Sequence, residues 1–201
     1  MSGVCIDVRR FVLENVADTC AVWNVLSSLT LYAAARAASC RFRITAYVEY
    51  ECLRDRSQRE EGDEEILQRF RAWRQEGLWP VHSLEVDDLF DIELLEQRRR
   101  LGKGELSSMV LARKLGAAVL TDDQKGRRLA ECYLGSPRLV QTTPHLFGWL
   151  LFEGRLADSD KDAVIKEHNK VGRPLEPFFE RIFMKALEMK LATRTGMCPP
   201  P

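Results

Sequence analysis

The sequence predicts an α/β fold, a three-layer sandwich with a mostly parallel central sheet and a C-terminal helical extension. Short apolar runs alternate with segments of helical period along residues 11–150, and this alternation is typical of a parallel sheet covered by helices. Residues 151–201 contain two further helical segments and no strand-like run. We therefore expect one domain over residues 1–150 and a helical extension packing on it over residues 151–201.

The expected strands are short runs, either apolar or alternating in polarity, that end at turn or capping residues. They cover residues 11–17, 41–45, 81–86, 117–120 and 139–140. The first run is interrupted by Glu14 and Asn15 and leads directly into Asp18. The run 117–120 is the clearest, because it lies between Gly116, placed as a helix stop, and the polar residues from Thr121 onward.

The expected helices show apolar residues near a 3.6-residue period or begin at a capping residue. They cover residues 21–38, 46–54, 87–100, 105–115, 124–132, 145–153 and 177–192, with two more starting near residue 66 and at Asp158 or Ser159. Thr45 is expected to cap the helix that follows it, and Gly102 and Gly104 to break the chain before residue 105. The charged stretch 55–65 is expected to be a loop, and residues 198–201 to fray.

Composition and charge narrow the function classes. The chain has 201 residues, of which 45% are apolar and 30% charged, as expected of a soluble globular protein. Its 30 basic and 30 acidic residues balance, so a uniform basic coat for nucleic acid is absent. Nucleic-acid binding stays open, because a local basic stripe beside an acidic metal site gives the same total.

The cysteines and the N-terminal residues indicate the compartment. The six cysteines include no Cys-x-x-Cys pair and no Cys/His cluster, a pattern that favours free thiols over a zinc site. The first residues lack the apolar core of a signal peptide, and no apolar run reaches about 18 residues. We expect a cytoplasmic protein without a membrane segment.

Carboxylates occur at four places along the chain, each at the edge of an apolar run. They are Asp18, Glu51, Glu105 and the pair Asp122-Asp123. Acids avoid apolar surroundings unless their charge is compensated. A parallel topology can bring all of them to one end of the sheet, where their mutual repulsion would require a cation. Mg²⁺ or Mn²⁺, which oxygen ligands bind, is the natural one.

Polar and basic neighbours extend this candidate site. Thr19 and Thr121 are candidates to orient a carboxylate or a water molecule, and Asn24 is a candidate contact to the metal shell. The basic residues that flank the acids are candidates to hold RNA phosphates along a groove. They are Arg98, Arg99, Arg100, Lys103, Lys125, Arg127 and Arg128. Alternatives stay open, because acids after strands also serve as turn and N-cap residues, and basic residues at helix ends complement the helix dipole.

The order of these motifs resembles that of the PIN-domain nucleases, and most closely the VapC-type toxins and related uncharacterised prokaryotic PIN proteins. The motifs are Asp-Thr, then Val-x-x-Glu-x-Leu, then Gly-Glu on a helix of small residues, then Leu-Thr-Asp-Asp. The resemblance covers roughly residues 11–150, and its most specific part is GKGELSSMVLARKLGAAVLTDDQKGRR.

The resemblance implies a role for each acid. Asp18, Glu51, Glu105 and Asp123 correspond to the four acids of the family, which bind Mg²⁺ or Mn²⁺ and cleave RNA. Asp122 is the alternative to Asp123, and Glu49 is the alternative to Glu51.

Together these observations predict a metal-dependent endoribonuclease, acting as a toxin or as a stress or defence effector. Its expected partners are the RNA substrate, an antitoxin or inhibitory protein, and a second copy of the chain. Two alternatives stay open: a non-catalytic PIN-like regulator that binds RNA or protein, and a DNA nuclease or phosphatase. For the homodimer or inhibitory-partner surface, we expect the helix 177–192, together with residues 28–38, to contribute, because its apolar residues spread around much of its circumference.

Overall fold

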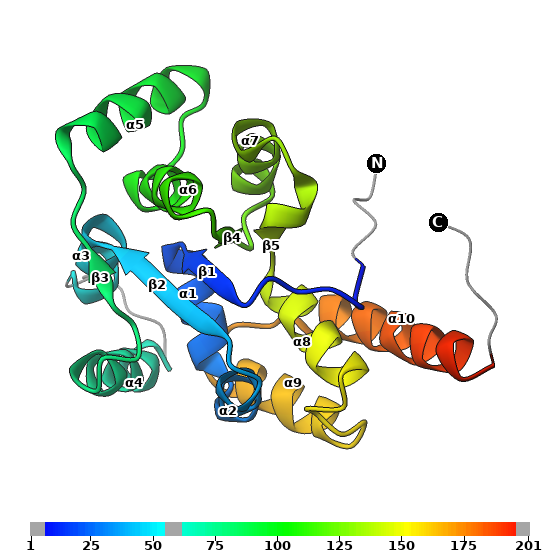
Figure 1. Ribbon diagram of the computed structural model, residues 1–201. Helices are drawn as coiled ribbons and strands as arrows, with labels where there is room; N and C mark the ends of the chain where they lie inside the picture. Colours follow the sequence, from blue (N-terminus) through cyan, green and yellow to red (C-terminus); the bar gives the residue numbers. More distant parts are fainter. Residues whose placement is uncertain (1–6, 55–61, 196–201) are drawn as a thin grey trace.

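The computed structural model, which describes residues 7–54 and 62–195, confirms the α/β sandwich (Figure 1). Its sheet has five strands in the order β3-β2-β1-β4-β5, and every neighbouring pair is parallel. The strands are β1 (Glu14–Ala17), β2 (Arg41–Thr45), β3 (Val81–His82), β4 (Ala118–Leu120) and β5 (Val140–Gln141). Each lies within or next to a run that the sequence predicts as a strand.

Helices cover both faces of this sheet, and two further helices lie toward its β3 edge (Figure 1). On one face are α5 (Val86–Arg98), α6 (Lys103–Leu115) and α7 (Gln124–Leu134). On the other are α1 (Thr19–Ser27), α2 (Leu29–Ala37), α8 (Thr143–Phe152), α9 (Asp160–Lys170) and α10 (Glu176–Thr195). The edge helices are α3 (Ala46–Leu53) and α4 (Asp63–Gln75), and a single 3₁₀ turn, η1 (Pro137–Leu139), precedes β5.

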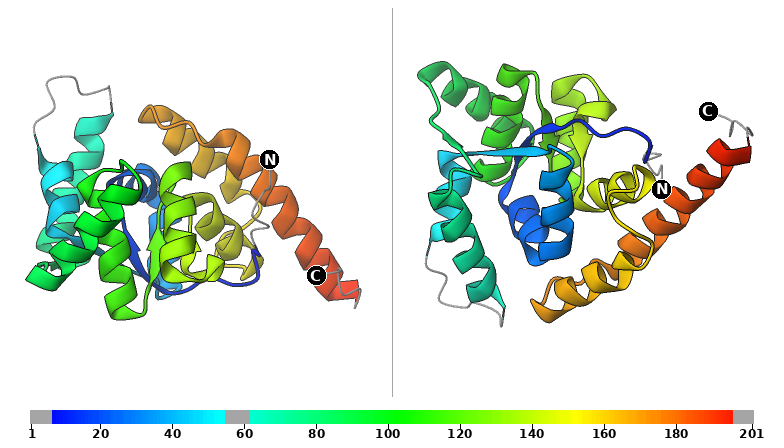
Figure 2. Two further views of the ribbon diagram at one scale, coloured as in Figure 1. Left: turned by 90° about the horizontal axis from the view of Figure 1, so that it is seen from above. Right: turned by 60° about the horizontal axis from the view of Figure 1, so that its bottom comes forward.

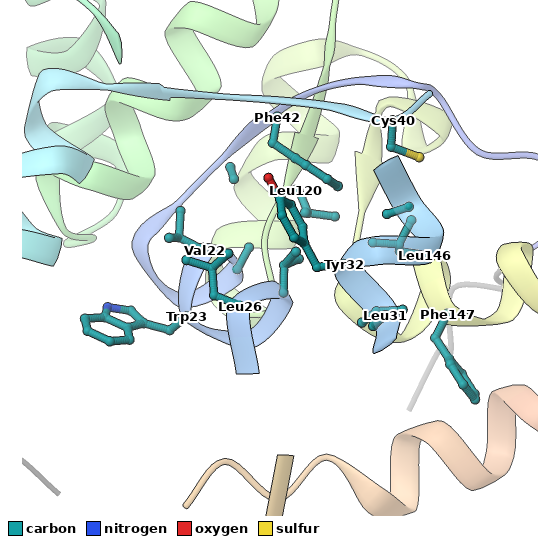
Figure 3. Close-up of a cluster of buried hydrophobic side chains, with 14 of the residues drawn as sticks. Val22, Trp23, Leu26, Leu31, Tyr32, Cys40, Phe42, Leu120, Leu146 and Phe147 are labelled. Atoms are coloured by element: carbon teal, nitrogen blue, oxygen red, sulfur yellow. The ribbon is translucent and has the colours of Figure 1, made fainter. Parts of the chain in front are cut away.

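The two central strands divide the apolar core between the two helical layers. Successive side chains of a strand point to opposite faces of the sheet. Val16 and Val119 therefore pack with the α5, α6 and α7 layer, while Ala17 and Leu120 pack with the opposite layer. Figure 3 shows this second cluster, in which side chains from α1, α2, β2, β4 and α8 lie together.

The segment predicted as one helix over residues 21–38 forms two helices, because the helix is interrupted once. Ser28 is extended, with φ −119° and ψ 115°, and separates α1 from α2. Its hydroxyl accepts from the Leu31 backbone N–H at 3.0 Å and donates to the Glu167 carboxylate at 2.5 Å. Glu167 also accepts from the backbone N–H and the hydroxyl of Thr30, at 3.2 and 3.1 Å. The prediction of one continuous helix is wrong, because a carboxylate distant in sequence caps a second helix start.

Replacing Glu167 by Ala should lower stability by about 1–3 kcal/mol, because the buried Ser28 hydroxyl loses its acceptor and the start of α2 loses a negative charge. Glu167→Gln keeps an acceptor oxygen and should cost less. Urea unfolding of the three proteins measures the difference. Equal losses for the two variants would mean that packing rather than the hydrogen bonds matters at this position.

Several other boundaries differ from the sequence prediction. Of the strand expected over residues 81–86, the first two residues form β3, because Glu85 N donates to the Asp88 carboxylate at 2.8 Å and starts α5 at Val86. Gly104 lies inside α6, so of the two glycines only Gly102 precedes that helix. Of the expected loop 55–65, residues 63–65 begin α4, while residues 55–61 and the predicted fraying of residues 198–201 fall outside the described residues.

The C-terminal helix α10 packs along α8 and extends beyond it (Figure 2). The helices approach closely at Gly148, where an added Cβ would lie 2.2 Å from the Ile182 Cγ2. Buried Phe179, Ile182 and Ala186 form the packed face, while Phe178, Met184 and Leu191 remain exposed. Among the described residues, no helix combines the length and the apolar character needed to cross a membrane.

Candidate functional site

The strand order of the sheet reverses between β1 and β4. The chain adds β2 and β3 on one side of β1 and then crosses over to add β4 and β5 on the other. In open parallel sheets, ligands bind beyond the carboxyl ends of the strands at the point where this order reverses. Asp18 follows β1 directly, and Thr121, Asp122 and Asp123 follow β4. The backbone N–H of Asp18 donates to the Leu120 carbonyl at 3.1 Å, which joins the two strand ends.

Asp18 is the most deeply buried carboxylate of this edge. It caps α1, and its Oδ1 accepts from the Ala21 backbone N–H at 2.8 Å. Its Oδ2 is buried and has no hydrogen bond of ordinary geometry among the described residues. Burial raises the pKa of Asp18 from 3.8 to about 7, and the negative charges of Asp122 and Glu105 add to the rise, whereas the Thr121 side chain and the Ala21 backbone N–H stabilise the charged carboxylate and act against it. The site therefore contains a carboxylate oxygen whose charge is poorly compensated.

Helix α6 carries Glu105 to the same edge. Ser108 Oγ donates to the Ala17 carbonyl at 3.1 Å, and Ser107 Oγ lies 2.7 Å from Thr45 Oγ1, so the start of α6 is tied to the ends of β1 and β2. Glu105 accepts from the Gly102 backbone N–H at 2.8 Å. Burial raises the pKa of Glu105, and the charges of Asp123 and Glu51 raise it further.

Helix α3 contributes Glu51, and the structure distinguishes it from Glu49. Glu51 accepts from the Gly104 backbone N–H at 3.0 Å and from the Thr19 hydroxyl, so it bridges the starts of α6 and α1. Glu49 instead forms an ion pair with Arg74 of α4. Of these two alternatives, only Glu51 is placed with the other predicted acids.

The two aspartates after β4 have different environments. Asp122 accepts from the Thr143 backbone N–H at 2.9 Å, from the Thr143 hydroxyl at 2.6 Å and from Asn24 Nδ2 at 2.8 Å. Asp123 caps α7 and accepts from the Gly126 backbone N–H at 2.6 Å. Asp122 is the neighbour whose charge acts on Asp18, and Asp123 is the one whose charge acts on Glu105. Both remain candidates for the fourth acid.

The predicted acids thus lie at one edge of the sheet, but most of them are engaged by donors of the protein. Within the described residues, no three His, Cys, Asp or Glu side chains are arranged to hold a metal ion as they stand. Two buried oxygens at the edge nevertheless have no partner there, Asp18 Oδ2 and Thr121 Oγ1. The charges of acidic neighbours raise the pKa of Asp18 and that of Glu105, so these carboxylates and the unpartnered oxygen form a donor set whose chemistry suits a hard divalent cation. The types of donor present, though not their present arrangement, therefore fit Mg²⁺ or Mn²⁺.

The predicted substrate-binding residues fall into two groups. Thr19, Asn24 and Thr121 lie among the acids, and Thr19 and Asn24 donate directly to Glu51 and Asp122. The second group consists of the basic residues. Of these, Arg99 Nη1 donates to the Lys125 carbonyl at 3.4 Å, which joins the end of α5 to the start of α7. Lys103 is exposed in the first turn of α6, and Arg127 is half-buried in α7.

Sequence reasoning missed three residues that shape this edge. Gly104 leaves room for Glu51, since an added Cβ would lie 2.4 Å from the Glu51 Oε2. Thr143 holds Asp122 through both its backbone N–H and its hydroxyl. Ser108 ties α6 to β1. The available signals were the sequence Thr142-Thr143-Pro144, which precedes the helix expected over residues 145–153, and the small residues of α6, but neither indicated a contact with the acids.

Comparisons with protein-family models, with curated proteins and with solved structures each gave no match.

Proposed function

We propose that the protein is a metal-dependent endoribonuclease that cleaves RNA phosphodiesters at the edge formed by β1 and β4. The observation that carries this proposal is Asp18: it is fully buried, it has an unpartnered oxygen, and it stands at the switch point of a parallel sheet among other acids. A structural N-cap needs one carboxylate oxygen. The N-cap role therefore does not explain why Asp18 has a second oxygen without a partner, or why its surroundings raise the pKa of its carboxyl group.

In such a site, some residues would hold the cation and others would orient the carboxylates. Asp18, Glu105 and either Asp122 or Asp123 would hold the cation, and Glu51 would complete the acidic set. A bound Mg²⁺ or Mn²⁺ would supply a Lewis acid that stabilises the negative charge developing on the phosphate. Thr19 and Gly104 fix the direction of Glu51, and Asn24 and Thr143 fix that of Asp122.

The basic residues beside the proposed site could bind the negatively charged backbone of the substrate. Arg99, Lys103 and Lys125 are exposed, and Arg127 is half-buried in α7. In this proposal they bind RNA phosphates without reading base sequence. RNA cleavage of this kind suits a toxin or a stress or defence effector in the cytoplasm, controlled by an antitoxin or other inhibitory protein. The resemblance to VapC-type toxins supports this role.

A second candidate is a non-catalytic regulator that binds RNA or protein through the same scaffold. The observation in its favour is that Glu51 and Asp122 are already satisfied by hydrogen bonds within the protein. In that case the acids would be structural, and a cation would not change the protein.

The experiment that separates these candidates is a substrate panel. The purified protein is incubated with RNA, single-stranded DNA, duplex DNA and p-nitrophenyl phosphate, with Mn²⁺ or with EDTA. We expect cleavage of RNA with Mn²⁺, none with EDTA, and a loss of at least about 100-fold for Glu105→Gln. Glu153→Gln, an exposed acid at the end of α8, is the matched control and should cleave like the wild type.

Each other outcome has its own meaning. Cleavage of DNA or of the phosphomonoester in place of RNA would assign the site to the third class of activity, a DNA nuclease or phosphatase. Cleavage that survives EDTA or Glu105→Gln would place the chemistry elsewhere. RNA binding without cleavage would favour the regulator.

A further inference from the structure

Arg173 of the C-terminal extension is held by three segments of the chain. It lies between α9 and α10, where its backbone N–H donates to the His168 carbonyl at 3.0 Å. Its guanidinium carbon Cζ lies 5.2 Å from the centre of the Trp23 ring of α1, which points away from the other labelled side chains in Figure 3. Its Nη2 donates to the Asp63 Oδ1 of α4 at 3.0 Å. Arg173 is therefore fixed where α1, α4 and the extension meet.

This position brings a positive charge close to the acidic edge. Trp23 is followed by Asn24, whose Nδ2 donates to Asp122 at 2.8 Å, so the turn of α1 that stacks on Arg173 also contacts the acids. Cys20 lies one turn earlier in α1. Burial raises the pKa of the Cys20 thiol to about 12, the charges of Asp122 and of two further acids of the edge add to the rise, and the charge of Arg173 acts against it. Arg173 and the acids thus act on the same side chain.

Arg173 and the other basic residues lie on different sides of the sheet. Arg99, Lys103 and Lys125 belong to the layer of α5, α6 and α7, whereas Trp23 and the helices of the extension belong to the opposite layer (Figure 1). The carboxyl ends of β1 and β4 lie between these layers. A phosphodiester backbone that crosses this edge from one layer to the other would therefore meet cations on both sides of the acids.

The guanidinium group of Arg173 has N–H donors that the ion pair with Asp63 does not satisfy. A guanidinium has five such donors. The Nε of Arg173 is buried and has no partner among the described residues, and the side chain as a whole is 22% exposed. Of the acids in the first turn of α4, Glu65 forms ion pairs with two basic side chains and Glu64 is exposed, where solvent screens its charge. Asp63 is the acid that would compete with a phosphate for Arg173.

We propose that Arg173 binds a phosphate of the RNA backbone that flanks the cleaved one on the α1 side of the edge, so that the C-terminal extension forms part of the substrate-binding surface. This inference rests on the proposed function. Trp23 orients the guanidinium plane by stacking and Asp63 holds one of its N–H groups, which leaves other N–H groups for the phosphate. Arg173 positions the substrate and takes no part in the chemical step.

The affinity for RNA and its dependence on salt test the proposal. The Kd is measured by fluorescence anisotropy of a labelled single-stranded RNA in EDTA, KM and kcat are measured by cleavage with Mn²⁺, and circular dichroism verifies folding. Arg173→Gln should raise Kd and KM by about tenfold and leave kcat within about twofold. It should also reduce the slope of log Kd against log salt by about 0.7, the value for one phosphate contact to a single strand. Arg173→Lys retains the charge and should retain the slope.

Asp63→Asn distinguishes phosphate binding from a purely structural ion pair. It removes the competing charge but keeps an oxygen that accepts from the Arg173 Nη2, so it should lower Kd by about two- to fivefold. An Arg173 that only fastens α4 to the extension would not give tighter binding when its partner is neutralised. Arg155→Gln is the matched control for the loss of one positive charge, because Arg155 is exposed and precedes α9 while Arg173 follows it. It should leave Kd within about twofold.

The outcomes separate this proposal from the proposed function. A wild type that binds or cleaves RNA, with Kd and salt slope unchanged in Arg173→Gln, would overturn the role of Arg173 and leave the nuclease standing. Binding that Asp63→Asn does not tighten would overturn it as well, and this result decides the matter even if Arg173→Gln does not fold. A wild type that neither binds nor cleaves RNA would overturn both proposals.

Discussion

Replacing Asp18 by Asn should make the protein more stable at pH 8 while abolishing cleavage. Asn retains an oxygen that can cap α1 through the Ala21 N–H. It removes a buried negative charge whose pKa is raised from 3.8 to about 7. At about 1.4 kcal/mol per pKa unit, the gain should be roughly 2–4 kcal/mol, or about 5–10 °C in Tm without metal. Activity should fall by at least about 100-fold.

The pH dependence of this effect has a definite sign. A carboxyl whose pKa is raised on folding contributes fully to stability below its ordinary value of 3.8, and that contribution is lost as the pH rises through about 7. His168 acts oppositely, since burial lowers its pKa from 6.5 to about 4 and destabilises the folded protein as the pH falls across that range. The difference in stability between the wild type and Asp18→Asn isolates the Asp18 contribution, and it should grow from pH 4 to pH 8.

Metal binding supplies an independent measurement. Mn²⁺ should raise the Tm of the wild type and should raise that of Asp18→Asn much less, because a ligand stabilises only the state that binds it. Glu153→Gln, at the end of α8, is the control for an exposed surface carboxylate. A variant that is less stable than the wild type at pH 8, with an equal response to Mn²⁺, would show that Asp18 is only a helix cap.

The parts of the fold that were predictable depend on short-range patterns. The stop at Gly116, which has φ +62°, and the strand that follows it lie within a few residues of their signals. The cap at Thr45 is equally local, since its hydroxyl accepts from the Val48 N–H at 3.3 Å. The break at Ser28 was not predictable, because its carboxylate partner, Glu167, lies in α9 and the apolar period continues through it.

In the candidate site, too, features with local signals could be predicted, whereas features that depend on residues distant in sequence could not. The positions of Asp18 and Asp122 after buried strands were readable, because parallel strands end at a common edge. The choice between Glu49 and Glu51 was not, because it depends on Arg74 in α4 and on Gly104 in α6. A glycine before a helix normally indicates a turn or a break. Gly104 instead reflects the space that another helix's side chain needs.

Gly104→Ala should separate cleavage from stability. The backbone of Gly104 is helical, so Ala is favoured there by about 1 kcal/mol on helix propensity alone. The added Cβ would lie 2.4 Å from the Glu51 Oε2, so the Glu51 carboxylate must move and lose the Gly104 N–H. We expect stability within about 1 kcal/mol of the wild type and a loss of cleavage on the order of 10²-fold, because small displacements of a catalytic group are costly.

Gly148→Ala is the matched control and should behave in the opposite way. It also lies within a helix, but its Cβ would meet the Ile182 side chain in the packed contact between α8 and α10. It should lower the Tm and leave the activity of the folded protein unchanged. Combining Gly104→Ala with Glu51→Ala then tests the route of the effect. If Gly104 acts through Glu51, the double variant should cleave no more slowly than Glu51→Ala alone. Losses that multiply would show that Gly104 affects cleavage independently of Glu51.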